Sequence, residues 1–165
     1  MLGIERHQIR RHTATLPVRA ALGASMLYHG VGKLKGEGPK KTGQMMQQLG
    51  FEKGEGWAKA AGIAEAFAGA SALLGFLTRP AALAVLATQA VAIAKVHAKN
   101  GYDISKGGFE YNLALMGIAL FMLIDGPGRY SLHEAIERGV EGKGLRRVRQ
   151  HMRPNLLVRA IHALQ

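Results

Sequence analysis

The sequence contains no cysteine. This absence excludes disulfides, thiolate nucleophiles, iron–sulfur clusters and cysteine-ligated zinc within the chain, and it leaves the cellular compartment open. Aromatic residues make up only 6% of the 165 residues, and no basic stretch alternates with stacking side chains. Binding to nucleic acid is therefore not expected, because single-stranded nucleic acid is held by aromatic side chains interleaved with basic ones.

Acidic residues are also scarce. There are 11 of them against 22 lysines and arginines, which gives a formal net charge of +11. An excess of this size favours an anionic partner, either nucleic acid or a lipid surface. The mean hydropathy of +0.02 is low for a membrane protein. That average conceals a strong segregation, because the charges gather near the two ends of the chain and in one connecting segment.

Four stretches are predominantly apolar and lack the polar stripe of a soluble amphipathic helix. They cover residues 16–34, 57–77, 80–98 and 109–125. Their lengths are close to the roughly 20 residues that a helix needs to cross the hydrocarbon core of a bilayer. The pattern predicts an all-α fold, a four-transmembrane-helix antiparallel bundle with short amphipathic surface helices and a basic C-terminal tail. The alternative is a soluble, alanine-rich helical bundle.

Local signals place the helix ends. We expect the first helix to begin at Leu16 with Pro17 in its first turn, and a short helix over residues 42–49 with Thr42 as its N-cap. Thr78-Arg79-Pro80 is expected to break the chain between the second and third stretches. Ser131 and Glu134 form a capping-box pattern for a later helix that ends at Gly139.

The domain organisation follows from these signals. Residues 1–15 form a basic N-terminal tail, residues 16–135 the bundle, and residues 136–165 a basic amphipathic tail. Twelve lysines and arginines lie on the side of the tails and of the turn at Arg79, and six lie on the other side. The positive-inside rule therefore predicts a multi-pass protein with both termini in the cytoplasm.

Polar residues within the spans collect in the outer half of the predicted bundle. Glu65 lies deep, and Gly62 and Gly69 flank it so that a neighbouring helix can approach closely. Its expected partner is His29 or a lysine, because charged groups in lipid face the bundle interior and pair. The candidate polar pocket consists of His29, Glu65, His97, Glu110 and Asn112. The pocket could hold a quinone headgroup or another small polar molecule, or it could be a structural network.

Other charged residues have simpler interpretations. Candidate structural ion pairs or anchors are Arg19, Lys33, Arg79, Lys95 and Asp125. For Lys33 and Lys95 we favour side chains that extend to the membrane interface. In the tail, a basic set beside an apolar stripe is typical of contact with anionic lipid headgroups: Arg146, Arg147, Arg149, Arg153 and Arg159. Two histidines without a motif do not predict a metal site, and no catalytic motif is present.

The order of several short motifs resembles the DoxX family of small bacterial inner-membrane proteins. The motifs are Arg19, His29-Gly30 with Lys33, Leu49-Gly50-Phe51, Glu65, residues 75–83, His97, Glu110 and residues 126–132. The likeness covers roughly residues 16–135. It implies a four-helix bundle in the cytoplasmic membrane. It also implies a link to oxidoreductases, because related proteins include a subunit of thiosulfate:quinone oxidoreductase and members associated with oxidative-stress assemblies.

Two functions from different classes follow as hypotheses. The first is a membrane subunit that interacts with a quinone within a larger complex, because without cysteine the chain cannot relay sulfur by itself. The second is a non-catalytic scaffold whose basic tail binds other subunits or anionic lipid. A conduit for protons or solutes is disfavoured, because the inner half of the predicted bundle has almost no polar residues.

Overall fold

The computed structural model of the protein describes residues 2–140, with the side chains of residues 15–139. Within this part of the chain the fold is helical and has no strand, which confirms the predicted all-α class. The long helices are α1 (Leu2–Leu34), α2 (Gly38–Gln48), α3 (Gly54–Leu74), α4 (Thr78–Ala92), α5 (Glu110–Asp125) and α6 (Leu132–Val140). A π-helix (Ile93–His97) and a 3-10 turn (Ala98–Asn100) extend α4, and a second 3-10 turn (Ile104–Lys106) lies before α5.

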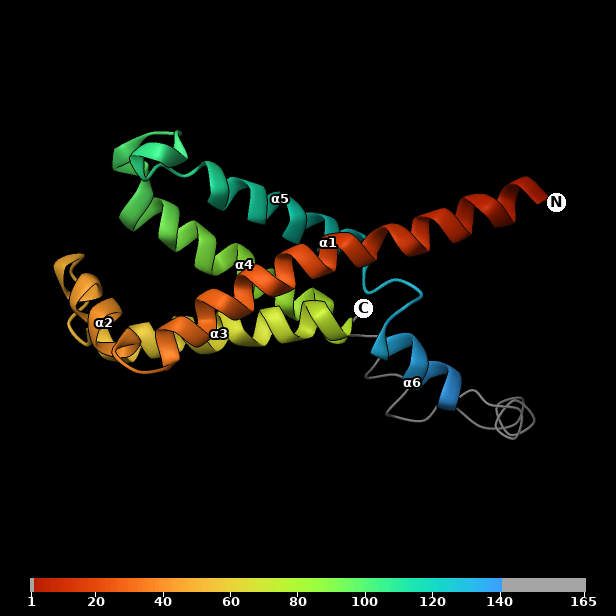
Figure 1. Ribbon diagram of the computed structural model, residues 1–165, viewed down its shortest axis with the longest axis horizontal. Helices are drawn as coiled ribbons and strands as arrows, with labels where there is room; N and C mark the ends of the chain where they lie inside the picture. The colour runs from red at the N-terminus through yellow and green to blue at the C-terminus, as the bar shows by residue number, and fades with distance from the viewer. Residues whose placement is uncertain (1, 141–165) are drawn as a thin grey trace.

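The helices form two antiparallel pairs. Helix α1 packs along α3, and α4 packs along α5, with α3 also contacting α4. In Figure 1 the two pairs lie together near α6 and diverge towards α2 and the connection between α4 and α5. We call these two ends of the bundle the α6 end and the α2 end. Helix α2 packs on α3 and on the last part of α1.

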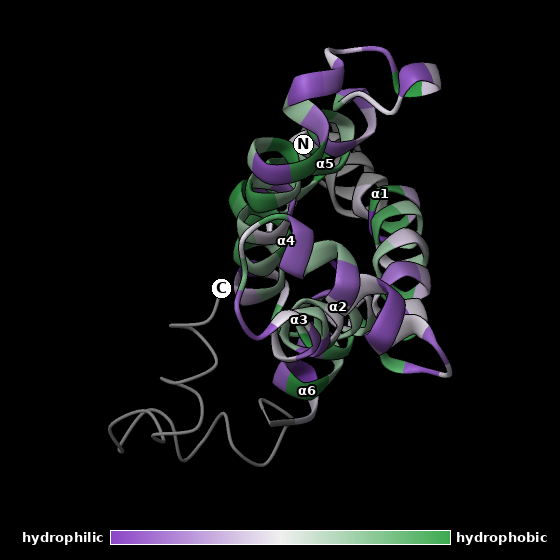
Figure 2. Ribbon diagram, turned by 90° about the vertical axis from the view of Figure 1, so that its left-hand side faces the viewer, coloured by the Kyte–Doolittle hydropathy of each residue, from purple (hydrophilic) through white to green (hydrophobic). Residues whose placement is uncertain are grey.

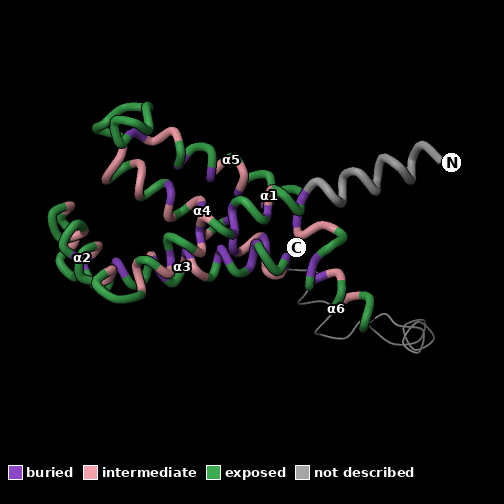
Figure 3. Tube along the Cα trace, viewed as in Figure 1, coloured by how far each residue is buried: buried purple, intermediate pink, exposed green. Residues whose placement is uncertain are grey.

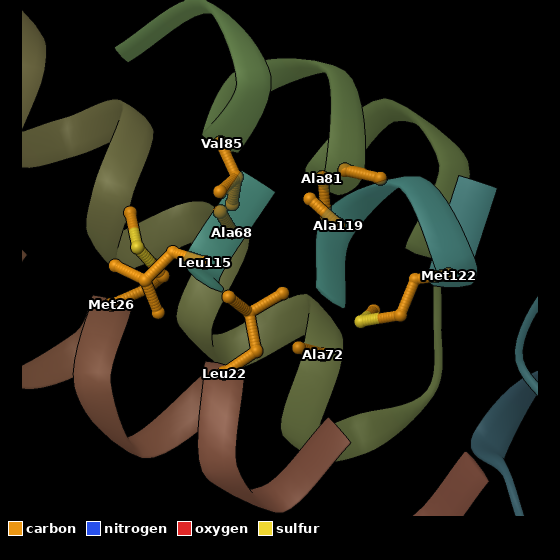
Figure 4. Packing of buried hydrophobic residues seen from close by; sticks show 10 residues of the cluster. Leu22, Met26, Ala68, Ala72, Ala81, Val85, Leu115, Ala119 and Met122 are labelled. Atoms are coloured by element: carbon orange, nitrogen blue, oxygen red, sulfur yellow. The ribbon is translucent and has the colours of Figure 1, made fainter. Parts of the chain in front are cut away.

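The core lies where the two pairs meet. Its members are small or flexible side chains from four helices, and Figure 4 shows how Leu22 and Met26 of α1 lie close to Leu115 of α5. The buried apolar residues of the cluster are Leu22, Met26, Ala68, Ala72, Ala81, Ala82, Val85, Leu115, Ala119 and Met122. Figure 3 shows that buried positions concentrate near this meeting point and thin out towards the α2 end.

Glycines bring α1 and α3 into backbone contact. A Cβ atom added to Gly30 would lie 2.4 Å from the amide nitrogen of Ala66, and one added to Gly69 would lie 2.5 Å from that of Leu27. A Cβ atom at Gly62 would lie 2.9 Å from the side chain of Leu34. These distances are shorter than real contacts allow, so only glycine permits this approach. The close approach expected at Gly62 and Gly69 is present.

The outer surface of the helices is largely apolar. Ile63, Leu83 and Ile124 are more than half exposed. In Figure 2 helices α4 and α5 are mostly coloured hydrophobic, whereas the connection between them is mostly hydrophilic. Among the described residues one helical stretch, Thr78–Asn100, is long and apolar enough by length and composition to cross a membrane. Helix α5 has 16 residues, which corresponds to about 24 Å of rise.

Several expected helix ends were wrong. Helix α1 begins at Leu2, so Pro17 lies inside the helix and not in its first turn. Residues 4–16 contain no glycine or proline, and the helix passes through Pro17 at the cost of one backbone hydrogen bond. Helix α2 begins at Gly38, because Pro39 suits a first turn. Thr42 is therefore inside α2 and not its N-cap.

The turn between α3 and α4 also differs from the prediction. The break lies at Gly75-Phe76-Leu77, and Thr78-Arg79-Pro80 forms the first turn of α4. Gly75 and Leu77 have φ values of 66° and 53°, which reverse the chain in the left-handed region. Proline is compatible with the first turn of a helix, so Pro80 starts α4 and does not interrupt it.

Candidate functional site

Arg19 joins three segments at the α6 end. Its side chain is 2% exposed and reaches from α1 to the last carbonyl groups of α3. Nε donates to the carbonyl of Ala72 at 2.8 Å, and Nη2 donates to that of Leu73 at 2.9 Å. Nη1 donates to the carbonyls of Pro127 and Tyr130, both at 2.8 Å. These bonds satisfy carbonyls that the end of a helix leaves without partners, so Arg19 holds α1, α3 and the connection before α6 together.

Further bonds close the same end. The backbone N–H of His133 donates to the carbonyl of Gly75 at 3.3 Å, and Arg79 Nε donates to that of Leu123 at 3.1 Å. Ser131 Oγ accepts from the N–H of Glu134 at 3.1 Å, as the capping pattern predicts. The carboxylate of Glu134 lies 3.6 Å from Arg138 Nε. The structure therefore has the hydrogen bond of the capping serine, whereas the glutamate is paired with an arginine. Asp125 is exposed at the end of α5.

A polar layer covers the core on its α2 side. Gln89 lies one turn beyond Val85 on α4, and Asn112 lies one turn before Leu115 on α5. Asn112 Nδ2 donates to Gln89 Oε1 at 2.7 Å, and both side chains are buried. Gln89 Nε2 in turn approaches Met26 Sδ on α1 at 3.9 Å. The amide donor of Gln89 thus points to a thioether, which is a weak acceptor.

The polar layer also includes an ion pair between helices α1 and α3. Lys33 Nζ of α1 lies 2.5 Å from Glu65 Oε2 of α3, and the two side chains are 22% and 8% exposed. Glu65 precedes the core residue Ala68 by three positions, so it stands on the same face of α3. The partner of Glu65 is therefore the lysine and not His29. Lys33, a candidate for a structural ion pair, thus forms one, and the pair satisfies a carboxylate that would otherwise be buried alone.

His29 lies beside this layer without joining it. Its ring centroid lies 5.5 Å from that of Tyr28 and 6.3 Å from that of Tyr111. The hydroxyl of Tyr111 forms a short hydrogen bond with that of Ser25, which ties α5 to α1. His29 itself is exposed. It is therefore available to a ligand on the surface of α1.

The other two pocket candidates belong to the α4–α5 connection. His97 Nδ1 lies 2.8 Å from the carbonyl of Gly107, and Glu110 Oε2 accepts from the N–H of Ile104 at 3.4 Å. Asp103 accepts from the hydroxyl and the N–H of Ser105, and these two bonds lower the pKa of its carboxyl. Lys95 is exposed, with Nζ 6.0 Å from the ring centroid of Phe51. His97 and Glu110 thus shape a loop.

The predicted pocket is therefore divided. Glu65 and Asn112 lie in the polar layer, His29 lies at its edge, and His97 and Glu110 lie in the connection. Sequence reasoning left Gln89, Ser25 and Tyr111 out of the set. The sequence pattern could have indicated Gln89. It lies one helical turn from the residues of α4 that face the core, and an antiparallel hairpin of α4 and α5 places Asn112 opposite it. The basic residues from Arg146 to Arg159 lie outside the described residues.

A groove runs over the surface of α1 beside α2. Its volume is about 730 Å³. The lining residues are Ala24, Leu27, Tyr28, His29, Val31, Gly32, Lys33, Thr42 and Met45. No carboxylate is among them. In the part of the chain that the structure describes, no group of three or more histidine, aspartate or glutamate side chains could hold a metal ion.

The helical fold, the apolar exterior and the buried polar layer define a small all-α protein suited to a lipid environment. The family model DoxX matches residues 14–98, just over half of the sequence. The chain therefore belongs to the DoxX family, and this membership identifies it as an integral membrane protein. No curated protein and no solved structure matches the chain at a significant level.

Proposed function

We propose that the chain is a four-span subunit of the bacterial inner membrane that serves a quinone-linked oxidoreductase or an oxidative-stress assembly. Both termini face the cytoplasm in this proposal, and the α2 end faces outward. The distribution of lysine and arginine, twelve on the side of the tails against six on the other, supports the orientation. The apolar exterior and membership of the family support the location.

The observation that carries the quinone part is the partner of Gln89. Its Nε2 donor is buried in the polar layer and approaches only a thioether sulfur, at 3.9 Å. A quinone carbonyl is a much stronger acceptor than a thioether, so replacing Met26 Sδ by such an oxygen would improve this hydrogen bond. Lys33 supplies a charged donor in the same layer, because its ammonium has three N–H groups and its bond to Glu65 uses one. A headgroup with carbonyl oxygens fits these donors.

The chain contributes binding and orientation in this function. It would hold the quinone headgroup at the polar layer, and the apolar exterior of the helices suits an isoprenoid tail. Electrons would pass between the quinone and a partner subunit. Any redox chemistry would thus depend on the assembly.

The test is quinone binding by the purified full chain in detergent. Titration with decylubiquinone should show saturable binding, and Gln89→Leu should weaken it by about tenfold, which corresponds to about 1.4 kcal/mol. Glu65→Gln should also weaken it, because it releases Lys33 from its buried partner. Gln44→Leu and Glu52→Gln change exposed residues and are the matched controls. Wild-type affinity in both Gln89→Leu and Glu65→Gln would rule out this site.

The second candidate is a non-catalytic scaffold. It is favoured by the internal pairing of the polar layer, in which Asn112 bonds to Gln89 and Lys33 to Glu65, so these side chains also fix helix packing. In this function the basic C-terminal tail would bind anionic lipid or partner subunits. Deletion of residues 143–165 should remove co-purifying subunits while the bundle stays folded. An unchanged set of partners after the deletion would count against the scaffold.

A further inference from the structure

The groove between α1 and α2 has an apolar wall and a polar end. Ala24, Leu27 and Val31 follow one another along α1 at helical spacing and form the wall. The hydrogen-bonding side chains of α1 begin beside this wall at His29 and continue to Lys33 near the end of the helix, and Thr42 of α2 also lines the groove. The groove is thus more polar towards the end of α1.

Charge distinguishes this groove from the rest of the apolar exterior. Lys33 brings a cation with N–H groups beyond the one given to Glu65, and His29 brings an exposed imidazole. Lys35, Lys40 and Lys41 are exposed and lie close to Lys33 and Thr42 in the sequence, and of these Lys40 pairs with Glu37 at 3.8 Å. The lining has four side chains with hydrogen-bonding groups, Tyr28, His29, Lys33 and Thr42, and it has a cation and no carboxylate, which is complementary to an anion.

We propose that this groove binds an anionic phospholipid. The phosphate lies at the polar end, where Lys33, His29 and Thr42 donate to its oxygens, and one acyl chain lies along Ala24, Leu27 and Val31. The groove volume of about 730 Å³ is within the usual range of about 300–1,000 Å³ for ligand sites. The proposal does not depend on quinone binding, because the polar layer and the groove are lined by different sets of residues that share Lys33.

An anionic phospholipid is favoured over other ligands because the groove has both an apolar wall and a polar end. Free phosphate would use the donors and leave the apolar wall without a partner. A neutral quinone would use the wall and bring no negative charge to the remaining N–H groups of Lys33. An anionic phospholipid satisfies both, and it is present wherever an integral membrane protein resides. Its phosphate forms charge-assisted hydrogen bonds with cationic donors, which are stronger than neutral ones.

The experiment measures lipid retention by the full chain in neutral detergent micelles. Micelles are doped with dioleoyl phosphatidylglycerol or with the zwitterionic dioleoyl phosphatidylcholine, and bound lipid is counted by native mass spectrometry. Phosphatidylglycerol should bind about tenfold more tightly, which corresponds to about 1.4 kcal/mol. His29→Leu and Thr42→Val should each reduce the retention of phosphatidylglycerol several-fold, and the double variant should reduce it further, while the cation of Lys33 keeps part of the preference. Thr88→Val is the matched control, because its side chain lies on the α4 side of the fold.

Each outcome has one meaning, because thermal unfolding in plain detergent first confirms that the variants fold. Equal retention of the two lipids by the wild type would overturn the proposal. Displacement of phosphatidylglycerol by equimolar inorganic phosphate would assign the site to the free anion and overturn the lipid site. Displacement by decylubiquinone that persists in Gln89→Leu would assign the groove to a quinone and also overturn the lipid site. Displacement that Gln89→Leu removes comes from the polar layer through the shared Lys33 and agrees with the lipid site. Lower retention of phosphatidylglycerol in the groove variants, with Thr88→Val unchanged, supports it.

Discussion

Lys33 on α1 and Glu65 on α3 form an ion pair of 2.5 Å beside the point where the two helices come closest. A Cβ atom at Gly62, one turn before Glu65, would lie 3.0 Å from Cβ of Lys33. The glycine therefore sets the distance between the helices, and the two long side chains span the gap that results. The close packing of α1 against α3 and the Lys33–Glu65 ion pair thus occur at the same place. The packing of these two helices therefore positions part of the polar layer.

Breaking this pair should destabilise the bundle. Lys33→Met leaves Glu65 as a buried charge without its partner, which we expect to lower the free energy of unfolding by about 1–3 kcal/mol, below the full cost of a buried pair because Lys33 is 22% exposed. The double variant Lys33→Glu, Glu65→Lys should recover part of the loss. Denaturant titration in detergent measures both. Lys40→Met, at an exposed pair, is the control, with an expected change of at most about 0.5 kcal/mol. An equal loss of unfolding free energy in Lys40→Met and in Lys33→Met would contradict the role of the pair.

The glycine contacts between α1 and α3 make a second prediction. Gly30→Ala and Gly69→Ala place a methyl group within 2.4 Å and 2.5 Å of backbone nitrogen, so each should lower the free energy of unfolding by about 1–3 kcal/mol. Gly117→Ala on α5 is the control, since a Cβ atom there would meet nothing within 4 Å. That substitution should be neutral or should stabilise by up to about 1 kcal/mol, because alanine favours a helix. Thermal unfolding of the three variants in one detergent compares them directly.

Much of this architecture follows from the sequence, and the exceptions have physical reasons. The apolar stretches predicted the all-α class, and Gly62 and Gly69 predicted a close helix contact. The partner of Glu65 was left open between His29 and a lysine, because His29 and Lys33 are one turn apart on the same face of α1. The choice depends on the register of α1 along α3, which is fixed by Gly30 against Ala66. No local pattern encodes that register.

The pairing of Gln89 with Asn112 was missed for a related reason. The two residues are 23 positions apart, and their contact depends on the register of α4 against α5. That register is set by the length of the π-helix, the 3-10 turns and the connection up to Phe109. Sequence reasoning placed residues 80–98 in the third span and residues 100–108 in a polar loop, and neither prediction gives a register. The His97 and Asn100 bonds to Gly107 determine its shape. A single residue more or less in this connection would move Asn112 off Gln89.

Arg19 gives a third prediction, in which shape matters more than charge. Its guanidinium donates to four carbonyls from two segments. Lysine keeps the charge but has a single nitrogen, so Arg19→Lys should lose several of these bonds and cost roughly 3 kcal/mol. Arg129→Lys, at an exposed position, should change the stability little. Proteolysis between α5 and α6 should also become faster in Arg19→Lys alone, because Pro127 and Tyr130 lose their anchor. Equal protection in both variants would argue against this role.

The absence of cysteine allows a direct test of the proposed topology, because any single cysteine introduced can be labelled against a blank background. Lys99→Cys lies on the exposed 3-10 turn after the π-helix, at the α2 end, and Arg129→Cys lies on the exposed connection before α6. With both termini in the cytoplasm, a membrane-impermeant maleimide should label Lys99→Cys in intact spheroplasts. It should label Arg129→Cys only after the membrane is opened by detergent. Labelling of both before detergent, or of Arg129→Cys alone, would exclude four spans with cytoplasmic termini, because an even number of crossings must keep residue 129 on the side of the tails and residue 99 on the other.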